Sequence, residues 1–183
     1  LLVVTPYYNK SNYLGYINHF TLVADSVNTP IIIYNVPGRT ACSIPPKAVA
    51  VLSKHKNIVG IKEASSDLSY AIQVRKECGE DFLLFSGNDD IVIPVLSLGG
   101  AGVISVAANV IPKEFSQMVK LYLEGNHKEA LDIQLKYLDL ISSLFIEVNP
   151  IPLKEMMNQL GHDVGEFRFP LYPISDEGKN IIT

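Results

Sequence analysis

A lysine ends an apolar, strand-like run in the segment NIVGIKEAS, residues 57–65. Residues 58–61 have the character of a buried strand, and Lys62 follows them directly. Burial of an unpaired ammonium group is so costly that such a lysine tends to lose its proton or find a partner. A neutral lysine amine attacks carbonyl carbons and can form a Schiff base. Lys62 is therefore a candidate nucleophile; the alternative is a side chain that reaches solvent or pairs with Glu63.

The preceding apolar run ends in YNVPGRT, residues 34–40, which carries two further candidate groups. The Tyr34 phenol can act as a general acid or base when it is aligned with a reacting atom. The Arg39 guanidinium matches the two oxygens of a substrate carboxylate. A turn at Pro37-Gly38 would bring Arg39 back over the strand end. The alternative is a well-packed turn with a surface arginine.

Tandem tyrosines, Tyr7 and Tyr8, end the first apolar run in TPYYN. In an extended chain their side chains point to opposite faces, so at most one should enter a given pocket. Packing at a subunit surface is the alternative, because tyrosine is common at protein interfaces. Both interpretations stay open from the residues alone.

Small residues mark two further strand boundaries, SGNDD at 86–90 and GGAGVIS at 99–105. Gly87 would allow the backbone to approach a ligand closely. A glycine-rich segment near a late barrel strand raises the possibility of a phosphate site, but GGAG precedes its strand and so lies at the wrong end. Asp89 and Asp90 precede a helical stretch and are predicted to act as N-terminal caps.

Composition excludes several function classes. The chain has 183 residues, is 48% hydrophobic and 19% charged, and carries a formal net charge of −4, as expected of an ordinary globular domain. No run of Lys or Arg exceeds two residues, and the apolar runs are too short to span a bilayer, so neither a nucleic acid nor a membrane is an expected partner. The two cysteines suggest no disulfide framework, no signal peptide is visible, and a reducing cytoplasm is the expected location. The histidines have no metal-ligand spacing, which argues against a zinc site: they are His19, His55, His127 and His162.

Short apolar runs alternate with helical periodicity over the first part of the chain, which predicts an α/β fold whose parallel strands are covered on both faces. The predicted strands are 1–5, 31–35, 58–62, 82–86 and 102–106, and the predicted helices are 13–27, 46–55, 68–78 and 91–98. Polar residues gather at the strand ends and not at their starts. In such sheets and barrels, ligands bind at the carboxyl ends of the strands.

The rhythm changes after residue 109. Helical patterns cover 112–124, 127–147 and 152–160, and Ser175 offers an N-cap for a short terminal helix. We therefore predict two parts, a β/α region at 1–110 and a helical domain at 111–183.

Together these segments resemble the dihydrodipicolinate synthase (4-hydroxy-tetrahydrodipicolinate synthase) family, within the class I aldolase group that includes N-acetylneuraminate lyase. The matching motifs are TPYYNK, YNVPGRT, GIKEAS, SGND and GGAGVISVAANV, with NPIPLK in the helical tail. The resemblance covers essentially all of the chain. It implies a TIM (β/α)8 barrel with a C-terminal helical domain, and a lyase that works through a covalent Schiff base with pyruvate, without a cofactor or metal.

The resemblance also implies residue roles. Lys62 would form the Schiff base with pyruvate, and Tyr34 would relay protons and contact the pyruvate carboxylate. Arg39 would bind the carboxylate of aspartate semialdehyde at the cleft mouth. Tyr8 would enter a neighbouring subunit's site to complete a proton relay, which requires a homo-oligomer, a dimer or a tetramer.

Three further positions match the family pattern. Gly87 and Ile104 correspond to backbone positions that line the pyruvate pocket, and Tyr7 corresponds to a tyrosine beside the feedback site of lysine-inhibited members. The implied reaction condenses pyruvate with L-aspartate 4-semialdehyde in lysine (diaminopimelate) biosynthesis. Arg39 favours it over the alternative, an N-acetylneuraminate or 2-keto-3-deoxy acid lyase, because neuraminate lyases usually lack this arginine.

The chain departs from the family pattern at its start, where the first visible strand would be the fourth of eight. We expect strands four to eight of the barrel, hence the C-terminal part of an enzyme. Alone it should be a poor catalyst, because part of the tyrosine relay and of the pocket wall is absent. A non-catalytic fragment that binds a small acid or a partner chain is the competing hypothesis.

Overall fold

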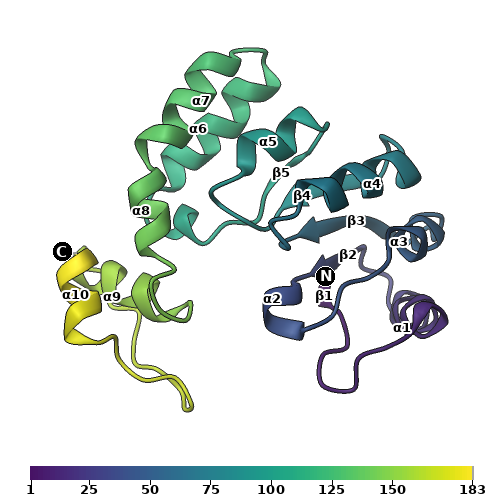
Figure 1. Ribbon diagram of the computed structural model, residues 1–183, viewed down its shortest axis with the longest axis horizontal. Coiled ribbons are helices and arrows are strands. Elements are labelled where there is room, and N and C mark those ends of the chain that lie inside the picture. The colour runs from purple at the N-terminus through teal and green to yellow at the C-terminus, as the bar shows by residue number, and fades with distance from the viewer. Residues whose placement is uncertain (183) are drawn as a thin grey trace. The chain divides into compact units, whose positions relative to one another are not determined.

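The first part of the chain forms a five-stranded parallel sheet in a computed structural model that describes residues 1–182 (Figure 1). The strands lie side by side in sequence order, and all four pairings are parallel. They are β1 (Leu2–Val4), β2 (Ile31–Asn35), β3 (Ile58–Glu63), β4 (Leu83–Ser86) and β5 (Gly102–Val103). The predicted α/β class is confirmed, and only the last strand is much shorter than its apolar run suggested.

Helices connect the strands, four of them where the periodicity predicts and α2 where a turn was expected. They are α1 (Tyr13–Asp25), α2 (Pro37–Thr40), α3 (Pro46–Leu52), α4 (Leu68–Cys78) and α5 (Val92–Ser97). Two of them begin at side-chain caps: Asn12 accepts a hydrogen bond from the Gly15 N–H, and Asp67 accepts one from the Tyr70 N–H. Strands added always in the same direction through right-handed crossovers place successive helices on one face of the sheet.

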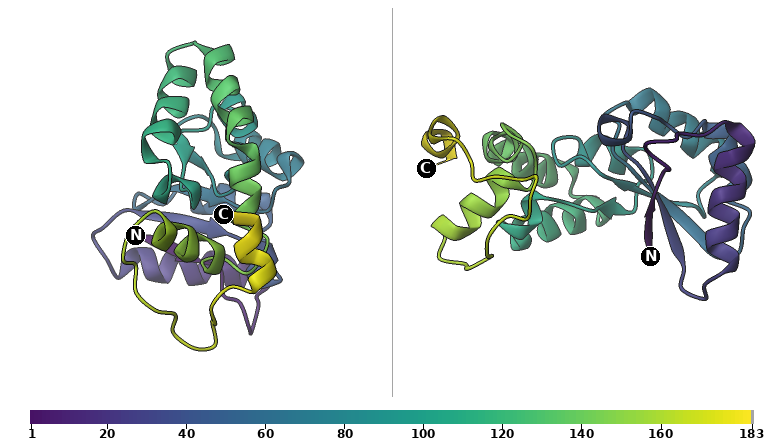
Figure 2. Two further views of the ribbon diagram at one scale, coloured as in Figure 1. Left: turned by 90° about the vertical axis from the view of Figure 1, so that its left-hand side faces the viewer. Right: turned by 90° about the horizontal axis from the view of Figure 1, so that it is seen from below.

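The core lies between that face and the helices, which corrects the expectation that both faces are covered. In β2, Ile31, Ile33 and Asn35 are fully buried, whereas Ile32 and Tyr34 are half-buried on the opposite face. The right-hand view of Figure 2 shows α1, in purple, alongside the strands. It buries one stripe at helical spacing, consisting of Tyr16, Phe20 and Ala24. The half-buried face therefore differs in character from the core, although both faces read as apolar in the sequence.

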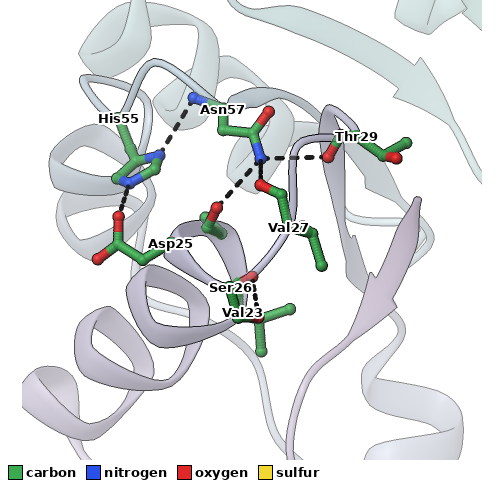
Figure 3. Close-up of polar contacts among 8 residues, drawn as sticks. Val23, Asp25, Ser26, Val27, Thr29, His55 and Asn57 are labelled. Carbon is green, nitrogen blue, oxygen red and sulfur yellow. Dashed lines mark hydrogen bonds and ion pairs between the residues drawn. The ribbon is translucent and has the colours of Figure 1, made fainter.

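Polar contacts pin the starting ends of β2 and β3, where the sequence looked bland (Figure 3). The Asn57 side-chain amide donates to the carbonyl oxygens of Ala24, Val27 and Thr29 at 3.1, 2.9 and 3.2 Å. The Asn57 N–H donates to His55 Nδ1 at 3.1 Å, so the ring carries its proton on Nε2, which lies 3.0 Å from Asp25 Oδ1. These contacts connect the segments that precede β2 and β3, at the end of the sheet that is remote from the candidate site.

The second part, from Ser105 onward, is a separate compact unit of helices. It contains the short 3₁₀ turn η1 (Ala107–Asn109), α6 (Pro112–Leu123), α7 (His127–Lys136), α8 (Leu138–Ser143), α9 (Ile151–Gln159) and α10 (Asp176–Ile182). The first unit ends at Ile104, whereas the predicted boundary follows residue 110, because η1 packs with α6. None of the helices in residues 1–182 has the length and apolar character needed to cross a bilayer.

Two details of the second unit bear on the predictions. The prediction of a single helix over 127–147 is wrong. The helix is interrupted at Tyr137, which separates α7 from α8, and α8 ends at Ser143. The Ser175 cap is confirmed, since its hydroxyl oxygen accepts a hydrogen bond from the Gly178 N–H at 3.0 Å.

Candidate active site

Lys62 and Tyr34 lie directly opposite each other at the carboxyl ends of β3 and β2. Residues paired in register project from the same face of a sheet, and this is the half-buried face. The Lys62 Nζ atom is 4.3 Å from the centroid of the Tyr34 ring. The sheet thus brings together the two groups that the sequence singled out as nucleophile and proton carrier.

The environment of Lys62 favours the neutral amine. Partial burial lowers the pKa of Lys62 below its ordinary value, and the positive charge of Arg39 lowers it further, while the Asp89 carboxylate opposes both effects. A lysine with a depressed pKa carries a larger fraction of unprotonated amine at neutral pH, the form that adds to a carbonyl carbon.

Tyr34 shifts in the opposite direction. Burial raises the pKa of its phenol above the ordinary value, and the Arg39 charge only partly offsets this. The phenol is therefore protonated at neutral pH and can donate a proton to an oxygen atom that develops negative charge.

Arg39 lies on a single helical turn instead of the predicted β-turn. Pro37 opens α2 at its first position, where its missing N–H costs nothing, and Ala41 ends it in a left-handed conformation with φ 53°. The guanidinium is exposed, and its charge acts on both Lys62 and Tyr34. The turn returns Arg39 toward the strand end, as expected, through a different local structure.

Asp89 has a role that the sequence did not reveal. The α5 helix begins at Val92 with Ile91 as its N-cap residue, so the predicted capping by Asp89 and Asp90 stays a prediction. Asp89 is 1% exposed, and its charge acts on Lys62. Its position directly after a strand end was the available signal for this second effect.

Glu63 does not pair with Lys62, so that alternative is wrong. Successive strand residues point to opposite faces, and Glu63 is buried on the helix-covered face at 3% exposure. Its carboxylate accepts hydrogen bonds from the Asn35 side chain and from the N–H and hydroxyl of Ser65. Lys62 is thus left facing Tyr34, Arg39 and Asp89.

Gly87 and Ile104 directly follow the carboxyl ends of β4 and β5. The Gly87 N–H donates to the Glu63 carbonyl at 2.6 Å, and the Ile104 N–H donates to the Ser86 carbonyl at 2.9 Å. A Cβ atom on Gly87 would lie 2.5 Å from the Ala64 Cβ, so only glycine allows this approach. Their predicted contact with a ligand stays a prediction.

The tandem tyrosines lie in the loop that follows β1. Their side chains are 63% and 92% exposed for Tyr7 and Tyr8, respectively, so neither is packed against Lys62 within this chain. Exposure of this degree leaves the predicted roles at a neighbouring subunit open. Over residues 1–182, no group of three or more His, Cys, Asp or Glu side chains gathers that could hold a metal ion.

Comparisons with known proteins relate the whole chain to one family. The model of the dihydrodipicolinate synthetase family matches residues 1–183. The 4-hydroxy-tetrahydrodipicolinate synthase of Clostridium tetani is 51% identical over 183 residues, which are 100% of this chain and 62% of that protein. The chain therefore spans about 62% of the length of this relative.

Solved structures show the same likeness. The crystal structure of dihydrodipicolinate synthase from Aquifex aeolicus matches with a TM-score of 0.96 and 42% identity, over 99% of this chain and 62% of that one. The chloride-inhibited dihydrodipicolinate synthase from Acinetobacter baumannii, crystallised with pyruvate, matches with a TM-score of 0.94 and 34% identity, over 99% of this chain and 62% of that one.

Proposed function

Because the chain belongs to the dihydrodipicolinate synthetase family, we propose that it carries the Schiff-base lysine of a 4-hydroxy-tetrahydrodipicolinate synthase. The reaction condenses pyruvate with L-aspartate 4-semialdehyde, a step of lysine biosynthesis. The single observation that carries the proposal is the half-buried Lys62, with a lowered pKa, whose Nζ lies 4.3 Å from the Tyr34 ring centroid.

The chemistry follows from these two side chains. The neutral Lys62 amine adds to the keto carbon of pyruvate, forming a C–N bond, and the former keto oxygen takes a proton supplied through the Tyr34 phenol. Tyr34 regains a proton from the amine nitrogen, which leaves a neutral carbinolamine. A second proton, taken from solvent and passed on by Tyr34, lets the hydroxyl leave as water, and the protonated Schiff base forms. Loss of a methyl proton then gives an enamine, whose carbon attacks the aldehyde of the second substrate.

Arg39 supports the assignment of that second substrate. Its exposed guanidinium, beside Lys62 and Tyr34, offers two parallel donors to the carboxylate of aspartate semialdehyde. The pyruvate complex of the Acinetobacter baumannii relative supports pyruvate as the first substrate. Gly87 and Ile104, at the ends of the neighbouring strands, would contribute backbone groups to the pocket. No cofactor is needed, because the covalent adduct itself withdraws electrons.

We also propose how the complete barrel and a neighbouring subunit would complete the site. The five strands would be strands four to eight of a closed (β/α)8 barrel, which agrees with the 62% share of the relatives' length and with the two sheet edges. The exposed Tyr8 would complete the proton relay of a neighbouring subunit in a dimer or tetramer, and Tyr7 would border a lysine feedback site.

Borohydride trapping tests the proposal. The complete protein that contains this chain is incubated with pyruvate and borohydride, digested and analysed by mass spectrometry. We expect one reduced pyruvyl group on Lys62, none in Lys62→Arg, and normal labelling in the matched variant Lys56→Arg, whose lysine is exposed. Absence of an adduct on an accessible Lys62 would favour the non-catalytic binding hypothesis.

A second measurement separates the substrates. Turnover is compared between aspartate semialdehyde with pyruvate and the 2-keto-3-deoxy acids. We expect Arg39→Met to depress the first reaction mainly through a higher KM for the semialdehyde. A wild-type preference for the sugar acids would instead place the protein among the related aldolases.

A further inference from the structure

A buried polar cluster lies directly behind Lys62 and Tyr34, on the other face of the sheet. The next residues along the two strands, Glu63 and Asn35, are also register partners, and they are 3% and 0% exposed. Asn35 Nδ2 donates to Glu63 Oε1 at 3.0 Å. The two strand ends are therefore joined twice, by the candidate catalytic pair on one face and by a side-chain hydrogen bond on the other.

Glu63 also holds the loop that follows its own strand. The Ser65 N–H donates to Oε1 and the Ser65 hydroxyl donates to Oε2, both at 2.9 Å. Each carboxylate oxygen thus has at least one partner, and all three donors are uncharged. Burial raises the pKa of Glu63, and the hydrogen bonds from Ser65 and Asn35 act against that rise.

Asn35 extends the cluster to the segment that bears Arg39. Its Oδ1 atom accepts hydrogen bonds from the Ile44 N–H at 3.2 Å and from the Ser43 hydroxyl at 3.3 Å. Segment 36–42, with Arg39 at its centre, is therefore anchored at both ends on Asn35, covalently at one end and by these bonds at the other. Three candidate site residues are attached to one buried cluster.

Stability alone does not explain why a carboxylate occupies the buried position of Glu63. Burying an ionisable group with neutral partners is seldom better for folding than an apolar side chain of similar size, whereas a fully bonded polar network specifies one geometry. The rate of a catalysed reaction falls steeply when the catalytic groups are displaced even slightly from their productive positions.

We propose that Glu63, through Asn35 and Ser65, is a positioning residue that fixes the Lys62 amine against Tyr34 and orients the Arg39 turn. This inference rests on the proposed Schiff-base function. Glu63 itself touches no reacting atom, because it lies on the opposite face from Lys62. Its carboxylate acts through the backbone of β3 and through the hydrogen bonds to Asn35 and Ser65.

The test compares Glu63→Leu, Glu63→Asp and Glu63→Gln in the complete protein that contains this chain. Leucine removes every acceptor, aspartate shortens the side chain by one methylene, and glutamine keeps the size and one acceptor oxygen. The structural control is Asn57→Ala, which loosens the opposite ends of the same strands by removing the three carbonyl contacts of Figure 3. Thermal unfolding, borohydride trapping and steady-state kinetics are measured for each variant.

The decisive quantity is kcat divided by the fraction of Lys62 that pyruvate and borohydride trap. Because unfolded protein is not trapped, this division corrects kcat for any unfolded fraction. We expect Glu63→Leu and Glu63→Asp to lower it roughly 10- to 100-fold, the range for a small misplacement of catalytic groups, and to shift the pH profile of trapping. Glu63→Gln should retain most of the wild-type ratio. Asn57→Ala should lower the unfolding temperature and leave the ratio unchanged.

Equal ratios in wild type, Glu63→Asp and Asn57→Ala would overturn the positioning role and leave Glu63 a structural residue. If Glu63→Leu fails to fold, Glu63→Asp against Glu63→Gln gives the same decision. Failure of the wild type to be trapped would overturn the proposed function itself and the inference with it, whereas a trapped wild type with unaffected Glu63 variants would overturn the inference alone.

Discussion

The Lys62 Nζ atom lies 4.3 Å from the centroid of the Tyr34 ring, and the two residues are register partners on adjacent parallel strands. Residues 28 positions apart thus meet because β2 and β3 pair directly (62 − 34 = 28). An amine over the face of a phenol gains some cation–π stabilisation when protonated. Burial outweighs that gain here, because the pKa of Lys62 is lowered overall.

The first prediction concerns the pH dependence of Schiff-base formation. The trapping rate should rise with pH through an apparent pKa below the value of about 10.4 for free lysine. Asp89→Asn should move this pKa further down, because the carboxylate stabilises the ammonium form, and Arg39→Met should move it up. The exposed neighbour Asp90→Asn is the control and should leave the profile in place. A shift of the same sign in both Asp89→Asn and Arg39→Met would contradict this electrostatic account.

The second prediction is a gain in stability on loss of the nucleophile. A lysine whose pKa is lower in the folded than in the unfolded state binds fewer protons when folded, so stability rises with pH across the window between the two values. At neutral pH, Lys62→Met should therefore raise the free energy of unfolding, by about 1 kcal/mol, while abolishing trapping. Chemical denaturation at pH 7 and pH 10 measures it, and the advantage of the variant should shrink at the higher pH.

The third prediction uses two glycines of contrasting surroundings. Gly87→Ala should cost roughly 1–3 kcal/mol, because its Cβ would lie 2.5 Å from the Ala64 Cβ and 3.0 Å from the Glu63 carbonyl oxygen. Gly38→Ala, in α2, has no atom within 4 Å of the added carbon and should be neutral or slightly stabilising. Urea unfolding compares them. Similar midpoints for the two variants would show that β4 can shift away from β3 without penalty.

The fourth prediction concerns Arg75, whose guanidinium holds the ends of α4 and α5. Arg75→Met should lower the free energy of unfolding by roughly 2–4 kcal/mol, because it leaves several carbonyl oxygens without their charged donor. Arg75→Lys should recover only part, and the exposed Lys76→Met is the control. Thermal unfolding is the measurement. A loss of stability no larger than that of Lys76→Met would contradict the stabilising role of the Arg75 guanidinium. The accepting carbonyls belong to Leu98, Gly79, Phe82 and Gly99, at 2.9, 2.7, 3.1 and 2.6 Å.

Features of the fold that depend on local pattern could be predicted from the sequence. The boundaries of β2 and α4 match their apolar runs and periodicity, and Ser175 caps its helix as expected. Lys62 stood out because burial of an ammonium group at the end of an apolar run is costly unless the group finds a partner. The break between α7 and α8 could not be seen, because the helical periodicity continues through Tyr137.

The sequence by itself determined which residues end the strands, and therefore which side chains could serve as amine, phenol and guanidinium. Only the tertiary structure decided which face each one occupies and what lies beside it. Asp89 and Glu63 are both acidic residues next to a strand end, yet one acts on Lys62 and the other lies on the opposite face with Asn35. Strand pairing and burial set that difference, because they join residues far apart in the chain and remove some of them from water.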